Sequence, residues 1–153
     1  MKKIRMYALA LIIALMAFGA FNTNAQAKTK WTKYTPTALR GDWIAKKNST
    51  GKFSDGSKST YQQDAFIDKK DFATGVVLDY NPKVLTKAYY HHAKGSKYYY
   101  VKGSGYGVTV YNKVELSGKK LRFCTYLTLN KKGHTTKAPF GFIKNYSNWL
   151  YKQ

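Results

Sequence analysis

Three aspartates lie close together in the stretch DAFIDKKD: Asp64, Asp68 and Asp71. Glycoside cleavage needs one carboxyl of raised pKa beside a second carboxylate, and the neighbouring lysines favour the ionised form of all three. The spacing also lacks the alternating oxygen ligands and the closing glutamate of a calcium loop. We therefore expect solvated loop charges. The alternative, a hydrolase built on these aspartates, requires the three carboxylates to converge.

The histidines and the cysteine predict no metal site and no nucleophile. His91 and His92 are adjacent on an expected strand, so their side chains point to opposite faces and cannot bind one metal ion together. Cys124 is the only cysteine and has no disulfide partner within the chain. We expect an inert, half-buried thiol; the alternative is a reactive thiol whose pKa Arg122 lowers. The sequence thus predicts no enzyme activity, no metal and no cofactor.

Runs of tyrosines are interleaved with lysines in the stretch TKAYYHHAKGSKYYYVKG, residues 86–103. Tyrosine rings can stack on sugar rings or bases, while lysines contact phosphates. The alternative is structural, because tyrosine is also a common cross-strand partner within sheets. The candidate ligand-binding residues are Tyr89, Tyr98, Tyr100, Lys87, Lys97 and Lys102.

The first 27 residues have the pattern of a secretory signal peptide. Lys2, Lys3 and Arg5 precede an apolar run, and the small-residue site Ala25-Gln26-Ala27 follows it. The apolar run is shorter than the roughly 20 residues of a membrane-spanning helix. We expect residues 1–27 to be removed, residues 28–153 to form one domain, and no transmembrane segment to remain after cleavage.

The expected mature chain is strongly cationic. Without the three signal-peptide cations it has 24 lysines and arginines against 7 aspartates and glutamates, a net charge of +17. Only Arg40 and Arg122 of these 24 are arginine. Because base-specific recognition favours the arginine fork, a lysine surface indicates diffuse polyanions and no specific nucleic acid. The other interpretation of the charge is a general surface adaptation such as solubility.

Apolar and polar residues alternate with a period of two, which is typical of half-buried strands. In residues 108–116 valines and leucine share one face, and in 121–129 we expect Leu121, Phe123, Leu127 and Leu129 to do so. Gly118 predicts a hairpin over 107–129, and Gly95 predicts a second one joining residues 86–92 to 97–103. Shorter expected strands are 42–47, 60–67, 75–80, 138–144 and 147–152. About eight strands predict an all-β fold, an antiparallel up-and-down barrel.

The stretch LRGDW, with Gly41 and Trp43, resembles the Gly-x-Trp that opens the first strand of lipocalins and related calycin barrels. The resemblance implies a lipocalin-like barrel in which the glycine permits a close turn and the tryptophan plugs the closed floor. Lipocalins stack a late arginine on that tryptophan, for which this chain offers only lysines such as Lys144 or Lys152. The chain is also similar to small, basic, Tyr- and Lys-rich secreted proteins of lactic-acid bacteria.

Together these features predict a secreted, cationic β-barrel binding module outside a Gram-positive-like cell. We expect it to be extracellular or cell-wall associated and retained on an anionic cell-wall polymer or acidic glycan. The alternative is a lipocalin-like carrier that holds a small apolar or aromatic ligand inside the barrel.

Overall fold

The structure is a computed structural model that describes residues 30–52, 56–77, 82–139 and 145–153. Within these ranges the chain forms strands and one short 3-10 helix, η1. In chain order the elements are β1 (Thr32–Lys33), η1 (Thr37–Leu39), β2 (Gly41–Ala45), β3 (Ser49–Lys52), β4 (Lys58–Tyr61), β5 (Gln63–Ile67), β6 (Phe72–Val76), β7 (Lys83–His92), β8 (Tyr98–Gly105), β9 (Val108–Ser117), β10 (Lys120–Leu129) and β11 (Leu150–Lys152).

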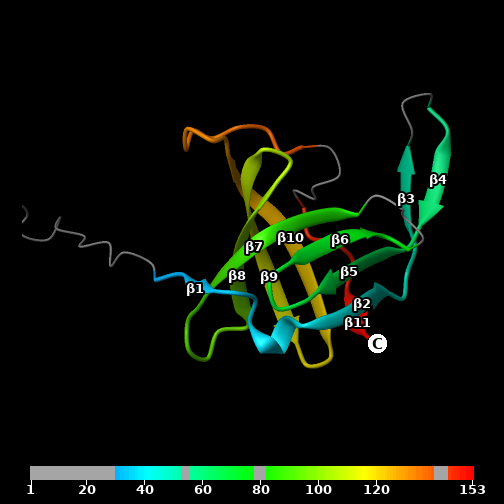
Figure 1. Cartoon of the computed structure of the whole chain (residues 1–153). Coiled ribbons are helices and arrows are strands. Elements are labelled where there is room, and N and C mark those ends of the chain that lie inside the picture. Colours follow the sequence, from blue (N-terminus) through cyan, green and yellow to red (C-terminus); the bar gives the residue numbers. More distant parts are fainter. Residues whose placement is uncertain (1–29, 53–55, 78–81, 140–144) are drawn as a thin grey trace, which may run out of the picture.

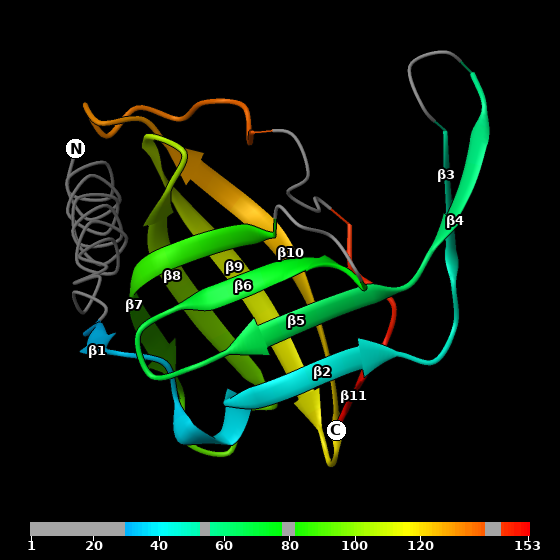
Figure 2. The ribbon, with the colours of Figure 1, turned by 45° about the vertical axis from the view of Figure 1, so that its right-hand side comes forward.

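Eight antiparallel strands close into a barrel, as the sequence predicts. Each strand from β5 to β10 pairs with the next strand along the chain, and β11 pairs with β2, which in turn pairs with β5. Strand β1 adds a further strand beside β7. The hairpin of β3 and β4 is a separate two-stranded sheet that projects away from the barrel (Figures 1 and 2).

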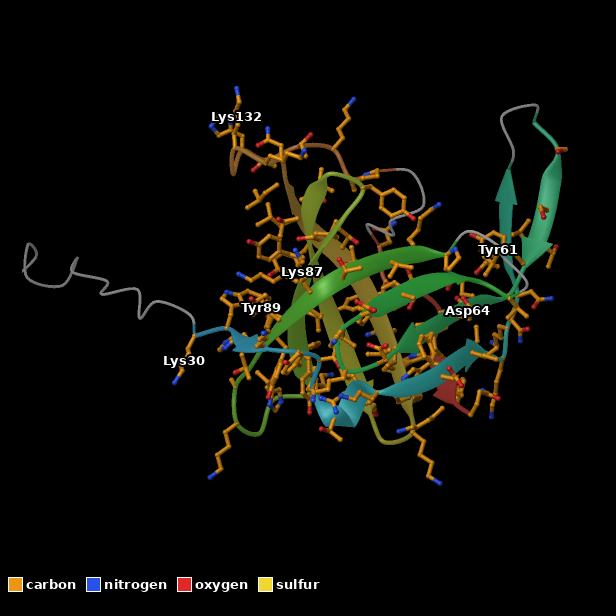
Figure 3. The ribbon with its side chains drawn as sticks, in the orientation of Figure 1. Lys30, Tyr61, Asp64, Lys87, Tyr89 and Lys132 are labelled. Carbon is orange, nitrogen blue, oxygen red and sulfur yellow. The ribbon has the colours of Figure 1, made fainter. Side chains whose placement is uncertain are left out.

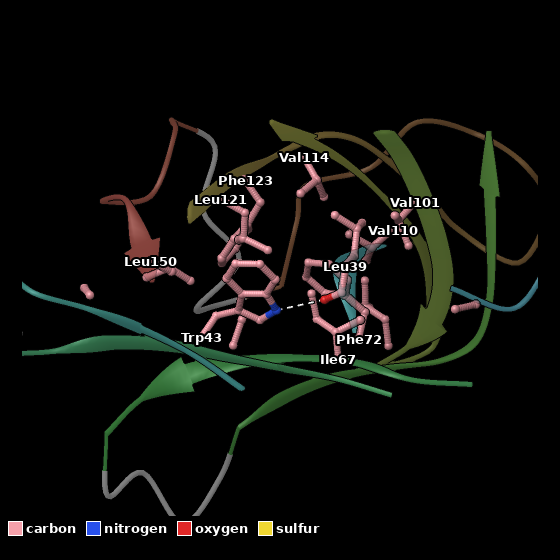
Figure 4. Packing of buried hydrophobic residues seen from close by; sticks show 14 residues of the cluster. Leu39, Trp43, Ile67, Phe72, Val101, Val110, Val114, Leu121, Phe123 and Leu150 are labelled. Carbon is pink, nitrogen blue, oxygen red and sulfur yellow. Dashed lines mark hydrogen bonds between the residues drawn. The ribbon is translucent and has the colours of Figure 1, made fainter. Parts of the chain in front are cut away.

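The core is a cluster of apolar side chains from the inner faces of the barrel strands (Figure 4). Trp43 is its largest member and is only 1% exposed. The Trp43 Nε1–H donates to the carbonyl oxygen of Leu39 at 2.8 Å, which ties the indole to η1. The Lys152 ammonium lies 5.5 Å from the centre of the Trp43 ring. Trp43 is therefore a buried core residue with a lysine over its ring.

Residues 147–149 precede β11 and connect β10 to β5 by hydrogen bonds without forming a strand. The Ser147 N–H donates to the Phe123 carbonyl at 2.8 Å, and the Phe123 N–H donates to the Ser147 hydroxyl at 3.1 Å. The Asn148 N–H donates to the Gln63 side-chain oxygen at 2.8 Å. These bonds join β10 to β5 beyond the short β11, so the expected strand 147–152 is a strand only over Leu150–Lys152.

Several other expected strands have different bounds. The expected 60–67 is divided between β4 and β5 at Gln62, whose amide donates to the Ala45 carbonyl. Residues 46 and 47 of the expected 42–47 are a bend after β2. Strand β6 begins earlier than the expected 75–80, of which 78–80 lie outside the described residues. Residues 138 and 139 are not strand, and 140–144 lie outside the described residues.

A β-bulge at Tyr126 reverses the alternation in the second half of β10. The ladder pairs Thr125 with Asn112 but Leu127 with Tyr111, so one residue of β10 is left over. Thr128 is therefore buried opposite Val110, while Leu127 lies on the outer face. The expectation that Leu127 and Leu129 share the inner face with Leu121 and Phe123 is wrong for this reason.

Two glycines of β8 face the inside of the barrel where β7 crosses closely. A Cβ at Gly103 would lie 2.9 Å from the Thr86 carbonyl oxygen, and one at Gly105 would lie 2.6 Å from that of Val84. Both separations are shorter than contacts that Cβ atoms make, so the two strands can approach this closely only because residues 103 and 105 have no side chain.

Candidate functional site

The outer face of strands β7 to β10 presents the tyrosines and lysines of the candidate site. The register pairs Tyr89 with Lys102 and Lys102 with Tyr111, which places these three side chains in one row across the sheet. Val101, Val110 and Val114 alternate with the outward residues and are fully buried in the core. The sheet thus brings four of the six candidates, Tyr89, Tyr98, Tyr100 and Lys102, onto one outer face.

Five rings on this outer face form a closed circuit of neighbours, which we call the ring cluster: Trp31, His91, Tyr100, Tyr126 and Tyr111. His91 stacks on Tyr100 with ring centres 6.2 Å apart, and the other contacts are edge-to-face at 5.8 to 6.4 Å. Tyr126 is 48% exposed. Such pairs are the favoured geometry of aromatic contacts, so the rings hold one another in place while presenting a surface to solvent.

Lys102 lies against the ring cluster. Its ammonium is 4.5 Å from the centre of the Trp31 ring and 5.7 Å from those of Tyr89 and Tyr111. Burial lowers the pKa of Lys102. Burial and the neighbouring Tyr100 and Tyr111 raise the pKa of Tyr126 to about 12, so this phenol stays neutral near pH 7. The centre of the face is therefore one ammonium group held among aromatic rings.

Lys97, another candidate, forms an ion pair beside this cluster. Its ammonium lies 2.7 Å from one oxygen of Glu115, and the Arg122 guanidinium lies 2.7 Å from the other. These hydrogen bonds and charges, that of Lys97 first, hold the pKa of the Glu115 carboxyl below its usual range. Arg122 in turn lies 4.5 Å from the Tyr146 ring and 4.7 Å from the Trp149 ring. In this part of the outer face, Arg122 connects the ion pair of Glu115 to two aromatic rings.

Lys87 lies apart from the ring cluster, at a bulge in β7. The register shifts between Thr86 and Tyr89, and Lys87 has a φ of 53°. Figure 3 shows Lys87 and Tyr89 on β7, on the side of the barrel that β1 joins. Both residues line a surface hollow of about 530 Å³.

The three aspartates line a second hollow, of about 360 Å³, together with Phe66 and other apolar residues. The carboxylate of Asp68 accepts hydrogen bonds from the backbone N–H groups of Lys70 and Asp71, at 2.6 and 2.7 Å. Asp68 therefore shapes the turn between β5 and β6. The three carboxylates do share one hollow, but one of them is engaged by the backbone.

His91 and His92 lie on opposite faces of β7, as expected. His91 belongs to the ring cluster, whereas His92 stacks on Tyr99 at 4.0 Å and bonds to the Ser96 carbonyl through Nε2 at 2.7 Å. Cys124 is buried, and burial raises the pKa of its thiol, which disfavours the reactive thiolate. No group of three or more His, Cys, Asp or Glu among the described residues could hold a metal ion.

Sequence reasoning did not place Trp31, Tyr111 and Tyr126 in the candidate site. Tyr111 could have been found, because alternation in β9 puts it on the face opposite the valines. Tyr126 could have been found in the same way, because alternation in β10 puts it on the face opposite Leu121 and Phe123. Trp31 has its position from the pairing of β1 with β7, which leaves no periodic signal in the sequence.

No helix within the described residues is long and apolar enough to span a bilayer. Comparisons with protein-family models, with curated protein sequences and with solved structures found no match for this chain.

Proposed function

We propose that the protein is a secreted, cationic β-barrel binding module that is retained on an anionic polymer of the cell envelope. The binding surface is the outer face of strands β7 to β10, with the ring cluster at its centre and lysines around it. The polymer supplies negative charge to the lysines and flat sugar faces to the tyrosines. Localisation at the cell wall of a Gram-positive-like cell is part of the same proposal.

One observation carries this proposal: cations and exposed rings are interleaved on a single outer face. Lys102 lies among Trp31, Tyr89 and Tyr111, and Lys113 lies 4.1 Å from the centre of the Tyr98 ring. A surface selected only for solubility would need no rings beside its charges. Rings and ammonium groups within a few ångströms of each other suit a ligand whose sugars and charged groups alternate.

The carrier alternative places the ligand inside the barrel. Against it, the buried cluster that includes Trp43, Phe72 and Phe123 occupies the interior, and the two hollows described above open on the outside. A solved complex with a ligand enclosed by the barrel strands would favour the carrier over the envelope-binding module.

The test is retention of the mature chain, residues 28–153, on washed cell walls at two salt concentrations. Exposed charges interact over about 10 Å at 0.1 M salt and only about 3 Å at 1 M. We expect the protein to bind at the lower concentration and to be released at the higher one. A bound fraction that is the same at both concentrations would contradict retention by charge.

A pair of tyrosine variants tests the contribution of the rings. Tyr126→Ala removes an exposed member of the ring cluster, and Tyr106→Ala removes an equally exposed tyrosine, 51%, at the turn between β8 and β9. We expect Tyr126→Ala to weaken binding to the walls by about three- to tenfold, since a ring contact contributes about 0.5–1.5 kcal/mol. Tyr106→Ala should bind as the native chain does, and equal losses would contradict the assignment.

A further inference from the structure

The hollow beside Lys87 lies between the N-terminal arm, the β5–β6 turn and the bulge of β7. Its volume is about 530 Å³. The lining residues are Lys33, Tyr34, Lys70, Asp71, Thr86, Lys87, Ala88 and Tyr89. This volume is within the range of about 300–1,000 Å³ of small-molecule sites, and it would accommodate one sugar or polyol unit with its phosphate.

Two residues of this hollow have a backbone conformation that L-amino acids rarely adopt. Tyr34 has a φ of 77° and Lys87 a φ of 53°. The only other such non-glycine residue in the described part of the chain is Tyr106, in a tight turn before Gly107. A conformation of this kind is strained and persists where the surroundings enforce it. Two of them at one surface hollow indicate that the hollow has a required shape.

Backbone hydrogen bonds enforce that shape. The Tyr34 N–H donates to the Ala88 carbonyl at 2.7 Å, and the Ala88 N–H donates to the Lys70 carbonyl at 2.9 Å. Ala88 is therefore drawn into the core, where it is 1% exposed, while the Lys87 side chain stays exposed. Three segments far apart in the sequence thus bring Lys33, Lys70 and Lys87 to the same hollow.

The charge of the hollow favours an anion. Three lysines line it against one acidic residue, Asp71. Lys33 and Lys69 also lie over the Tyr34 ring, at 5.2 and 4.9 Å from its centre. Lysines are point charges without the planar fork that matches a carboxylate, so three of them suit the tetrahedral arrangement of phosphate oxygens.

We propose that this hollow binds one phosphate group of a phosphodiester-linked polymer. Lys33, Lys70 and Lys87 contact the phosphate oxygens, and the adjoining sugar or polyol packs against Tyr34 and Tyr89. This inference rests on the proposed function and names the chemistry that the envelope polymer must contain. Tyr89 also contacts Lys102, so the hollow borders the ring cluster and one polymer chain can occupy both.

The test compares two triple variants of equal net charge. One is Lys33→Gln with Lys70→Gln and Lys87→Gln; the control changes Lys94, Lys119 and Lys132, which are exposed in turns and loops elsewhere. The probe is a short soluble poly(glycerol phosphate), followed by calorimetry. We expect the hollow variant to lose at least tenfold in affinity and the control less than threefold. Equal losses of affinity in the two variants would overturn the localised site. Retention by charge would still hold in that case if salt releases the native protein from walls.

Two further arms test the chemistry of the ligand. A polygalacturonate of matched charge supplies carboxylates only, and we expect the hollow variant and the control to lose equal affinity for it. Vesicles of phosphatidylglycerol present the same phosphodiester on a lipid, and binding to vesicles without binding to the soluble polymer would overturn the proposal.

A variant of the acidic lining residue tests the charge of the hollow. Asp71→Asn removes the opposing charge and should strengthen polymer binding by about threefold. Unchanged or weaker binding by this variant, if folded, would contradict the assignment.

Discussion

Glu115 is the only glutamate of the chain, and at the scale of single residues its position is the least expected. Alternation in β9 correctly predicts that it lies on the outer face with Tyr111 and Lys113, where a carboxylate would be solvated. Its side chain is nevertheless only 4% exposed, because Lys97 and Arg122 close over it. Burial on an outer face depends on neighbours from other segments, and no single stretch of sequence reports them.

We predict that Glu115→Gln destabilises the protein at neutral pH by about 1 kcal/mol, because it leaves the partner cations without a carboxylate. The pKa of Glu115 is lowered in the folded chain, so its stabilising contribution is full above the unfolded value of about 4.3 and is lost as the pH falls through the folded pKa. Urea denaturation at pH 7 and pH 3 measures both effects.

The difference between native and Glu115→Gln chains should therefore shrink at pH 3. Asp42→Asn, an exposed carboxylate change in β2, is the matched control and should shift the free energy of unfolding little at either pH. A Glu115→Gln chain as stable as the native one at pH 7 would show that the ion pairs contribute nothing to stability.

At the scale of elements, β11 closes the barrel with only three residues. Leu150 points into the core and is fully buried, whereas Tyr151 points outward beneath Lys46, whose ammonium lies 4.3 Å from its ring centre. We predict that Leu150→Ala lowers the free energy of unfolding by about 2–5 kcal/mol, the usual result of a cavity in a packed core.

Tyr151→Ala, on the same strand, is the control and should lower the free energy of unfolding by less than about 1 kcal/mol. Denaturant midpoints of the two variants decide the comparison. Equal losses would mean that β11 contributes through its backbone pairing with β2 and β10, and that the core contact of Leu150 adds little.

The long strands could be predicted from the sequence with nearly their observed bounds, whereas several short strands were expected with different bounds and β1 and β3 were not expected. Strands β9 and β10 have ten residues each, long enough to show a two-residue alternation even though that of β10 reverses after the bulge. Strand β11 is too short to show an alternation of its own. The residues before it, Ser147 and Asn148, are held by hydrogen bonds from both backbone and side chains. The bulge at Tyr126 adds a single residue to a regular strand, so it is visible only once the pairing with β9 is known.

At the scale of the whole molecule, lysine supplies nearly all the positive charge, and this predicts how retention depends on pH. Lysines keep their charge up to about pH 10, whereas histidines lose theirs near pH 6.5. We predict that retention on washed walls is constant from about pH 5 to 9 and falls above that, with Lys102 losing its charge before the other lysines because burial lowers its pKa.

Sedimentation of the bound fraction with walls, with circular dichroism to confirm folding at each pH, measures this profile. A fall in retention near pH 6.5 would contradict an interaction carried by the lysines. The composition of the outer face could thus be predicted from the sequence. Its layout could not, because Trp31 and the hollow beside Lys87 depend on contacts between β1, β7 and the β5–β6 turn.

Gly103 and Gly105 let β8 press against the backbone of β7 inside the barrel. The curvature of the barrel between β7 and β8 consequently depends on the absence of these two side chains. An alanine at either position would push the two strands apart and flatten the sheet there. A redesign that enlarges the interior to hold a ligand must therefore keep glycine at positions 103 and 105 and shorten core side chains on other strands.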